Sequence, residues 1–416
     1  MPRSKPDKSP PPLSTGLSSD LAATSLHNPK RRKPQPAKRP ASWRYPVAND
    51  APVFDPADEA AWLTFLAEYG YVVVQALSAA EVQAAEDTFW DEAASHLGWS
   101  RDDPRSWEAN ERIRTMSRRS DCGHFRGFDQ SALVWQLRKA PSVRRVYNAI
   151  SRQYCGAADG EPQLCAFNSI NVFRPHGVNP AWKTTAEPWY HVDNPKPDAA
   201  LKQEKIVFPG VINLMEVSAD TGGFVCVPKS HLLLGKRPSA DSVHEGEYLD
   251  LEPYDNFVDS EANARAGNTL HTQPILPTTG GRRGTMLVWD PRLVHCSTCS
   301  LTPPERNARA REARLLRLAA FVAACPARWA SAEAIAQRRR MVSERMCANT
   351  HIPWMGDAAT QRRFEAVAFY DGVWDDAEAV RLIEGDAPPD AEAETAEPEG
   401  RSGPPLTRRA AEVPPA

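Results

Sequence analysis

The chain has 416 residues, 41% of them hydrophobic and 25% charged, and its formal net charge is −3 at pH 7. This length and composition are sufficient for one substantial hydrophobic core. Its eight cysteines are spread from Cys122 to Cys347, which excludes a small disulfide scaffold and favours free thiols in a reducing compartment. No stretch approaches the roughly 20 consecutive apolar residues of a membrane-spanning helix, and the N-terminal sequence has no hydrophobic signal-peptide core.

The two ends of the chain differ from its middle. Residues 1–54 are predicted to be a disordered basic tail, because residues 1–44 are rich in Pro, Ser, Lys and Arg. Within it, the basic residues of 30–39 indicate either a nuclear localisation signal or a solvated tail, and an organelle transit peptide is a further alternative. Residues 385–416 are predicted to be a disordered acidic, Pro-rich tail. We therefore expect an intracellular protein, cytoplasmic or nuclear, whose folded domain lies at 55–370.

Helices and strands alternate through this domain. Asp55 and Pro56 suit the N-cap and first turn of a helix. A later helix has one apolar stripe, formed by Val82, Ala85, Phe89 and Ala93. In chain order, the predicted elements are a helix at 55–68, a strand at 71–74, helices at 79–97 and 135–152, strands at 168–173, 206–217, 284–290 and 315–326, and a solvated basic helix at 332–345.

Residues 232–280 interrupt this pattern with many acidic residues, glycines and prolines. A loop of that length inside a compact domain is usually functional or disordered. We expect an insertion near the mouth of a cavity, and both a lid and a passive surface loop are open interpretations.

Two short segments contain the residues that suggest a chemistry. In an extended strand, residues i and i+2 point the same way, so His191 and Asp193 can direct an imidazole and a carboxylate at one point. His295 ends a second strand-like run about a hundred residues later and could supply a third ligand. Two histidines and one carboxylate on one face, with the remaining positions open, form the facial triad of non-heme Fe(II) oxygenases.

The chain resembles the phytanoyl-CoA dioxygenase family of Fe(II)/2-oxoglutarate oxygenases over about residues 55–330. The resemblance implies a mainly β protein with flanking helices and a double-stranded β-helix (jelly-roll, cupin-like) core. It implies no particular substrate, because one fold supports many reactions. The matching segments, in order, are 65–74, 77–82, His191-x-Asp193, 222–231, His295-x-Ser297 and a late strand with Arg317.

The resemblance also implies roles for individual residues. His191, Asp193 and His295 would hold Fe(II), leaving positions for 2-oxoglutarate and O2. The distal carboxylate of 2-oxoglutarate needs a cation, and a planar guanidinium matches it bidentately. Arg317 is expected to have that role, with Arg314 as a rival of opposite strand parity. Further contacts to the co-substrate are expected from Ser297 and, with a structural role as the alternative, from Asn171.

The predicted function is hydroxylation of a C–H bond in a small organic substrate, with release of succinate and CO2. The carboxylate at Asp193 favours hydroxylation over halogenation, while desaturation and other oxidations stay open. The alternatives are a catalytically silent cupin-like binding protein, for which a nuclear location is open, and the same chemistry on a macromolecule. We expect no membrane association and no nucleic-acid surface on the core, while the basic N-terminal tail leaves nucleic-acid binding open and the oligomeric state is not predicted.

Overall fold

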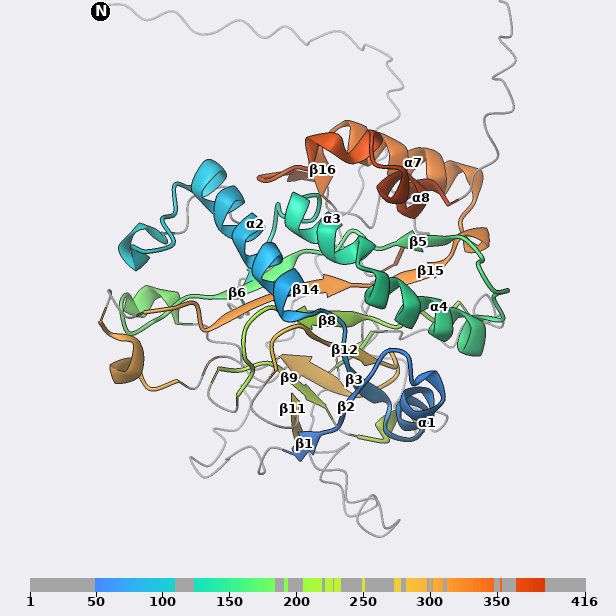
Figure 1. The fold of residues 1–416 in the computed structure, drawn as a ribbon, viewed down its shortest axis with the longest axis horizontal. Helices are drawn as coiled ribbons and strands as arrows, with labels where there is room; N and C mark the ends of the chain where they lie inside the picture. The colour runs from blue at the N-terminus through green and yellow to red at the C-terminus, as the bar shows by residue number, and fades with distance from the viewer. Residues whose placement is uncertain are drawn as a thin grey trace, which may run out of the picture. The chain divides into compact units, whose positions relative to one another are not determined.

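Two β-sheets form the centre of the protein in the computed structural model, and helices pack on the outer face of the larger sheet (Figure 1). The predicted fold class, a mainly β jelly roll with flanking helices, is confirmed. The structure describes residues 49–108, 123–183, 191–193, 205–218, 221–226, 228–232, 249–250, 273–277, 282–297, 300, 302–309, 313–347, 352–353 and 364–385.

The larger sheet has seven strands in the order β2-β3-β12-β8-β14-β6-β4, antiparallel except for the parallel β2–β3 pair. Alternate residues face the smaller sheet, and one cross-strand row of them consists of Val73, Leu287, Val211 and Phe321. These apolar side chains form the core between the sheets. The strands are β2 Val53–Phe54, β3 Tyr71–Gln75, β4 His124–Phe125, β6 Ile170–Phe173, β8 Gly210–Asn213, β12 Thr285–Trp289 and β14 Arg317–Val322.

The smaller sheet has six strands in the order β1-β11-β9-β13-β7-β10. Two of them, β10 and β11, come from within residues 232–280, so this segment supplies part of the sheet as well as connecting chain. Apart from these two strands, residues 233–280 lie outside the described part of the chain. The strands are β1 Asn49–Ala51, β7 His191–Val192, β9 Phe224–Cys226, β10 Leu249–Asp250, β11 Gln273–Pro277 and β13 His295–Ser297.

The folded domain extends beyond the predicted bounds 55–370 at both ends. Strands β1 and β2 lie within the predicted tail and pair with β11 and β3. At the other end, Arg338 donates hydrogen bonds to the carbonyls of Leu382 and Ile383. Arg338 is therefore buried, not part of a wholly solvated basic face. The predicted nuclear signal at 30–39 lies outside the described residues.

The helices agree with the sequence where their caps are strong. The predicted helix 79–97 is confirmed to the residue, with a capping box between Ser78 and Glu81. The single helix expected at 135–152 is wrong, because Ala140 is extended ahead of Pro141 and divides it in two. The first helix begins later than expected, with Asp58 as its N-cap. The α-helices are α1 Glu59–Tyr69, α2 Ala79–Leu97, α3 Ala132–Lys139, α4 Pro141–Cys155, α7 Ala332–Ser343 and α8 Ala377–Glu384.

Short elements complete the fold. The predicted strands 168–173 and 206–217 are shorter than expected, at β6 and β8. Two further strand pairs lie outside the main sheets, β5 with β15 and β16 with β17. The remaining elements are β5 Gln163–Cys165, β15 Ala324–Pro326, β16 Met346–Cys347 and β17 Phe364–Glu365, with 3₁₀ turns at Pro104–Ser106, Pro180–Trp182, Ser230–Leu232, Pro304–Asn307, Ala327–Trp329 and Asp371–Trp374.

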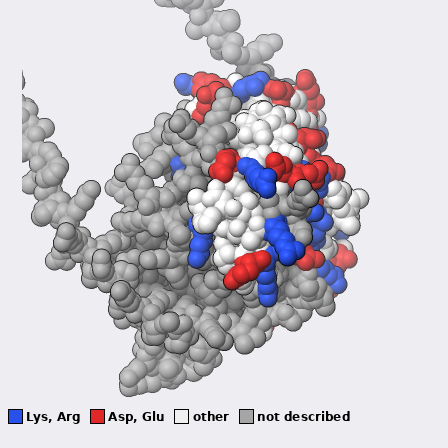
Figure 2. All heavy atoms as spheres, turned by 90° about the vertical axis from the view of Figure 1, so that its left-hand side faces the viewer, with Lys and Arg blue, Asp and Glu red and all other residues white. Residues whose placement is uncertain are grey.

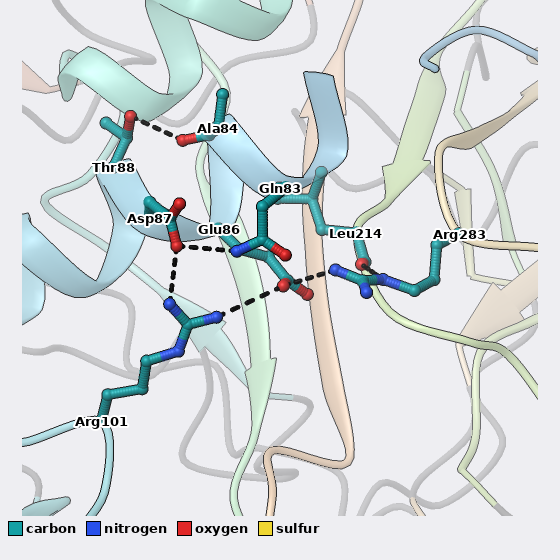
Figure 3. A network of polar contacts seen from close by, with 8 residues as sticks. All are labelled: Gln83, Ala84, Glu86, Asp87, Thr88, Arg101, Leu214 and Arg283. Carbon is teal, nitrogen blue, oxygen red and sulfur yellow. Dashed lines mark hydrogen bonds and ion pairs between the residues drawn. The ribbon is translucent and has the colours of Figure 1, made fainter. Parts of the chain in front are cut away.

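A polar network joins helix α2 to the turn before β12 (Figure 3). The buried Glu86 forms ion pairs with Arg283 and, at 3.7 Å, with Arg101. Arg283 also donates to the carbonyl of Leu214 at 3.0 Å, and Arg101 pairs with Asp87 at 2.6 Å. These contacts hold the middle of α2 against the larger sheet.

On the face drawn in Figure 2, acidic and basic side chains are interspersed over the described surface. Nucleic-acid-binding faces instead gather Lys and Arg into a patch or stripe. Among the residues that the structure describes, no helix is both long enough and apolar enough to cross a membrane.

Glu92 gives the fold a pH-dependent contact between α2 and α3. Its carboxyl group accepts hydrogen bonds from the backbone N–H groups of Ala132 at 2.6 Å and Leu133 at 3.4 Å. Burial raises the pKa of Glu92 to about 7. The folded state therefore holds a proton that the unfolded state releases near pH 4.5, so this group's contribution to stability is full at low pH and is lost as pH rises through 7.

We expect Glu92→Gln to remove this pH dependence. Between pH 5 and pH 8 the wild type should lose up to about 3 kcal/mol of unfolding free energy through this group, and the variant should not. Urea unfolding at both pH values measures the difference, with the exposed neighbour Asp91→Asn as the control. Equal pH profiles of Glu92→Gln and wild type would contradict the assignment.

Candidate active site

Neighbouring strands of the smaller sheet bring His191, Asp193 and His295 together. Strands β7 and β13 are antiparallel, and His191 lies directly opposite His295. Asp193 follows β7 in a bend, where its N–H donates to the carbonyl of Pro291 at 2.8 Å. One ligand atom from each of the three residues lies within 4.8 Å of the other two.

The geometry suits a divalent metal ion. Asp193 Oδ1 lies 3.4 Å from His191 Nε2, and Asp193 Oδ2 lies 3.4 Å from His295 Nε2. His295 Nδ1 is 2.9 Å from the carbonyl of Leu293, so a proton on Nδ1 leaves the Nε2 lone pair directed at the cluster. Two nitrogen ligands and one carboxylate on one side can hold a metal and leave its other positions open.

Two aromatic rings from different sheets form a wall beside the three ligands. Phe224 on β9 stacks on the His295 ring, with centroids 5.3 Å apart. Trp289, the last residue of β12, contacts both Phe224 and His295, and its indole N–H donates to Asp193 Oδ2 at 2.8 Å. Trp289 was not among the predicted site residues, although its alternation with Leu287 on a buried strand was a usable signal.

Arg317 begins β14 and is buried between the sheets. Its Nη1 donates to the carbonyl of Gly222 at 3.3 Å, and its Nε has no hydrogen-bond partner among the described residues. Burial lowers the pKa of Arg317 to about 10, so the guanidinium stays charged at neutral pH. It lines a cavity together with Val73, Val211, Asn213, Val217, Phe224 and Leu287. Because Phe224 lines this cavity and stacks on His295, the cavity adjoins the His–Asp–His cluster.

The other predicted site residues are not among the residues that line this cavity. Ser297 is opposite Phe224 on β13 and is partly exposed. Asn171 is buried on β6, opposite Ala319, whereas Asn213 on the other side of Ala319 lines the cavity. Arg314 is exposed on the chain before β14.

His124 and Asn213 are two residues of the interior that sequence reasoning did not place there. The His124 ring stacks on Phe321 with centroids 4.8 Å apart and lies opposite Asn171. Asn213 alternates with the buried Val211, so its inward direction could have been read from the sequence. The position of His124 depends on a two-residue strand with no periodicity to reveal it.

Comparison with known proteins gives a family. A search of curated proteins found no match to this chain. Among solved structures, the epimerase SnoN, in complex with Fe3+, alpha ketoglutarate and nogalamycin RO, is 16% identical, covers 66% of this chain and 85% of its own, and has a TM-score of 0.40. SnoK, a non-heme alpha ketoglutarate dependent carbocyclase from nogalamycin biosynthesis, is 17% identical, with 66% and 87% covered and a TM-score of 0.38. AviO1 from Streptomyces viridochromogenes Tue57 is 16% identical, with 65% and 96% covered and a TM-score of 0.36.

The family model for phytanoyl-CoA dioxygenase (PhyH) matches residues 66–308, which is more than half of the chain. This match includes all three residues of the His–Asp–His cluster and both glycines of the Gly222–Gly223 pair. The resemblance stated from the sequence is therefore confirmed, and the chain belongs to the phytanoyl-CoA dioxygenase family.

Proposed function

We propose that this protein is an Fe(II)- and 2-oxoglutarate-dependent dioxygenase that hydroxylates a C–H bond of a small organic substrate. The observation that carries the proposal is the placement of a buried arginine in a cavity adjoining a His–Asp–His cluster. A bound metal ion would account for the close approach of the three ligand residues, and a bound carboxylate would pair with the buried arginine. The family to which the chain belongs supports the same reaction class.

The metal would be held by His191, Asp193 and His295. Imidazole and carboxylate ligands suit Fe(II), and three ligands of six leave room for a bidentate oxo acid and for O2. With iron and 2-oxoglutarate bound, the site would couple oxidative decarboxylation of the oxo acid by O2 to oxidation of a substrate C–H bond, with release of succinate and CO2.

Arg317 would bind the distal carboxylate of 2-oxoglutarate. A buried charge without a counter-ion is costly, and its pairing with a planar carboxylate recovers part of that cost. The cavity walls beside it are mostly aliphatic, from Val73, Val211 and Leu287. These walls exclude water, which strengthens the ion pair relative to one at the surface. Ser297 and Asn171 are proposed as further polar contacts to the co-substrate, and Asn213 is added because it lines the cavity.

Asp193 favours hydroxylation over halogenation. A halide needs a ligand position on the metal, and here the carboxylate lies within 3.4 Å of both histidine Nε2 atoms and so takes that position. The substrate class is proposed to be a small organic molecule, because the cavity lies in the interior between the two sheets.

The test is anaerobic titration of the iron-loaded protein with 2-oxoglutarate, followed in the visible region, and then measurement of O2-dependent succinate formation. A metal-to-ligand charge-transfer band and succinate release are expected. A folded, iron-loaded protein that gives neither would contradict the proposal and favour a catalytically silent binding protein.

The Gly222–Gly223 pair is expected to set the position of Arg317. A Cβ atom on Gly223 would lie 2.8 Å from Arg317 Nη1, so alanine there must displace the guanidinium. We expect Gly223→Ala to raise the KM for 2-oxoglutarate about ten- to a hundredfold, because displacements near 1 Å have effects of this size. Succinate assays measure it, and Gly372→Ala, whose Cβ meets a tyrosine ring at 3.3 Å, is the control. An unchanged KM in Gly223→Ala would show that the guanidinium position is not critical.

A further inference from the structure

Trp289 is buried at the end of β12 and makes a directed contact with the candidate metal site. Its side chain is 3% exposed and belongs to the core cluster between the sheets. The indole N–H donates to Asp193 Oδ2 at 2.8 Å. A hydrogen bond to an ionised acceptor in a buried position is among the stronger ones in proteins. The His-x-Asp…His pattern does not include this residue.

Four contacts restrain Asp193, one through its backbone and three through its carboxylate. Its N–H donates to the carbonyl of Pro291, in the turn between β12 and β13. Its Oδ2 accepts from Trp289 and lies 3.4 Å from His295 Nε2. Its Oδ1 lies 3.4 Å from His191 Nε2. The backbone hydrogen bond fixes the position of the Asp193 main chain, and the indole hydrogen bond fixes the rotation of its carboxylate.

We propose that Trp289 is a positioning residue that keeps Asp193 a one-oxygen ligand of the metal. The indole N–H occupies Oδ2 and leaves Oδ1 to coordinate. This inference rests on the proposed metal site and adds a role for a residue outside the ligand set.

The rotation of the Asp193 carboxylate decides whether one or both of its oxygens would bind the metal, and the metal has a limited number of ligand positions. Two histidines and one carboxylate oxygen would fill three of six positions, and a bidentate oxo acid with O2 would need the other three. A carboxylate that binds through both oxygens would take one of these. Trp289 thus keeps open a position that the proposed reaction needs.

The packing around Trp289 allows the N–H to be tested separately from the ring. The ring contacts Phe224 at 4.8 Å and His295 at 5.2 Å between centroids. Trp289→Phe retains an aromatic ring in this position and removes the donor. Trp62→Phe is the matched control, because Trp62 is fully buried and its indole donates to the carbonyl of Pro56 at 3.3 Å.

The experiment is titration of the metal-free protein with Co(II), followed by visible absorption. We expect Trp289→Phe to weaken Co(II) binding about 10- to 100-fold, as is typical when a partner of a metal ligand is lost. We also expect its Co(II) spectrum to change in intensity as the coordination number changes. Trp62→Phe should match the wild type in both. If Trp289→Phe binds Co(II) with wild-type affinity and spectrum, the proposal is overturned. If the wild type binds no Co(II), the metal site itself is overturned.

A second measurement, which needs no Trp289 variant, covers the case in which Trp289→Phe does not fold. Labelling with ¹⁵N-tryptophan gives indole N–H signals from the twelve tryptophans of the chain. In Asp193→Ala, one indole signal is expected to shift strongly and to exchange faster with solvent than in the wild type. If no indole signal responds, the hydrogen bond does not exist in solution and the proposal fails.

Discussion

Replacing His191 with alanine is expected to abolish metal binding and turnover while leaving the fold intact. The variant retains Asp193 and His295 as two ligands, and a two-ligand site cannot compete with water for a labile divalent ion. The lost side chain lies in the smaller sheet, directly opposite His295, so the larger sheet and its helices are not disturbed. Metal content after dialysis and succinate formation measure the effect.

The control for this prediction is His96→Ala. His96 is partly exposed in the last turn of α2 and is not part of the His–Asp–His cluster. It tests whether loss of any imidazole affects the measurements. Full metal content in His191→Ala would remove His191 from the ligand set and require another third ligand.

Replacing Arg317 with methionine is expected to weaken 2-oxoglutarate binding by about two to three orders of magnitude, the usual cost of removing one partner of a buried charge pair. Methionine retains much of the volume and lacks the charge. The metal site is not changed directly, because the arginine contacts the Gly222 carbonyl and not a ligand. Binding is measured by the charge-transfer titration.

A comparison of two oxo acids sharpens this test. In the wild type, 2-oxoglutarate should bind far more tightly than 2-oxobutyrate, which lacks the distal carboxylate. In Arg317→Met the two should bind almost equally. Arg314→Met, at an exposed position three residues earlier, is the matched control and should behave as the wild type. A large preference for 2-oxoglutarate that persists in Arg317→Met would assign the carboxylate to another cation.

Helix caps, strand alternation and proline positions are local features, and the elements that depend on them could be predicted from the sequence. The capping box at Ser78 and Glu81 begins α2, and Gly98, in the left-handed region, ends it. Strand parity placed Arg317, Ala319 and Phe321 on one face of β14, as the register shows. The division of the helix at Pro141 was also readable, since a residue before proline avoids the helical region.

Features that depend on long-range register could not be read in this way. Alternation suggested that His191 and Asp193 face one point, but β7 ends at Val192. Asp193 takes its direction from a backbone contact with Pro291, a hundred residues away in sequence. The choice between Asn171 and Asn213 likewise depends on which side of β14 borders the cavity. The order of the strands in the sheet cannot be read from the spacing of residues in the sequence.

The direct pairing of His191 with His295 has a mechanical consequence. An ion held by both would cross-link the chain across about a hundred residues and so close a long loop. Closing such a loop costs conformational entropy on folding, and binding of the ion to the folded state would offset part of that cost. Occupancy of the site would therefore decide how firmly strands β9, β10 and β11, all of which lie inside that loop, are retained in the smaller sheet.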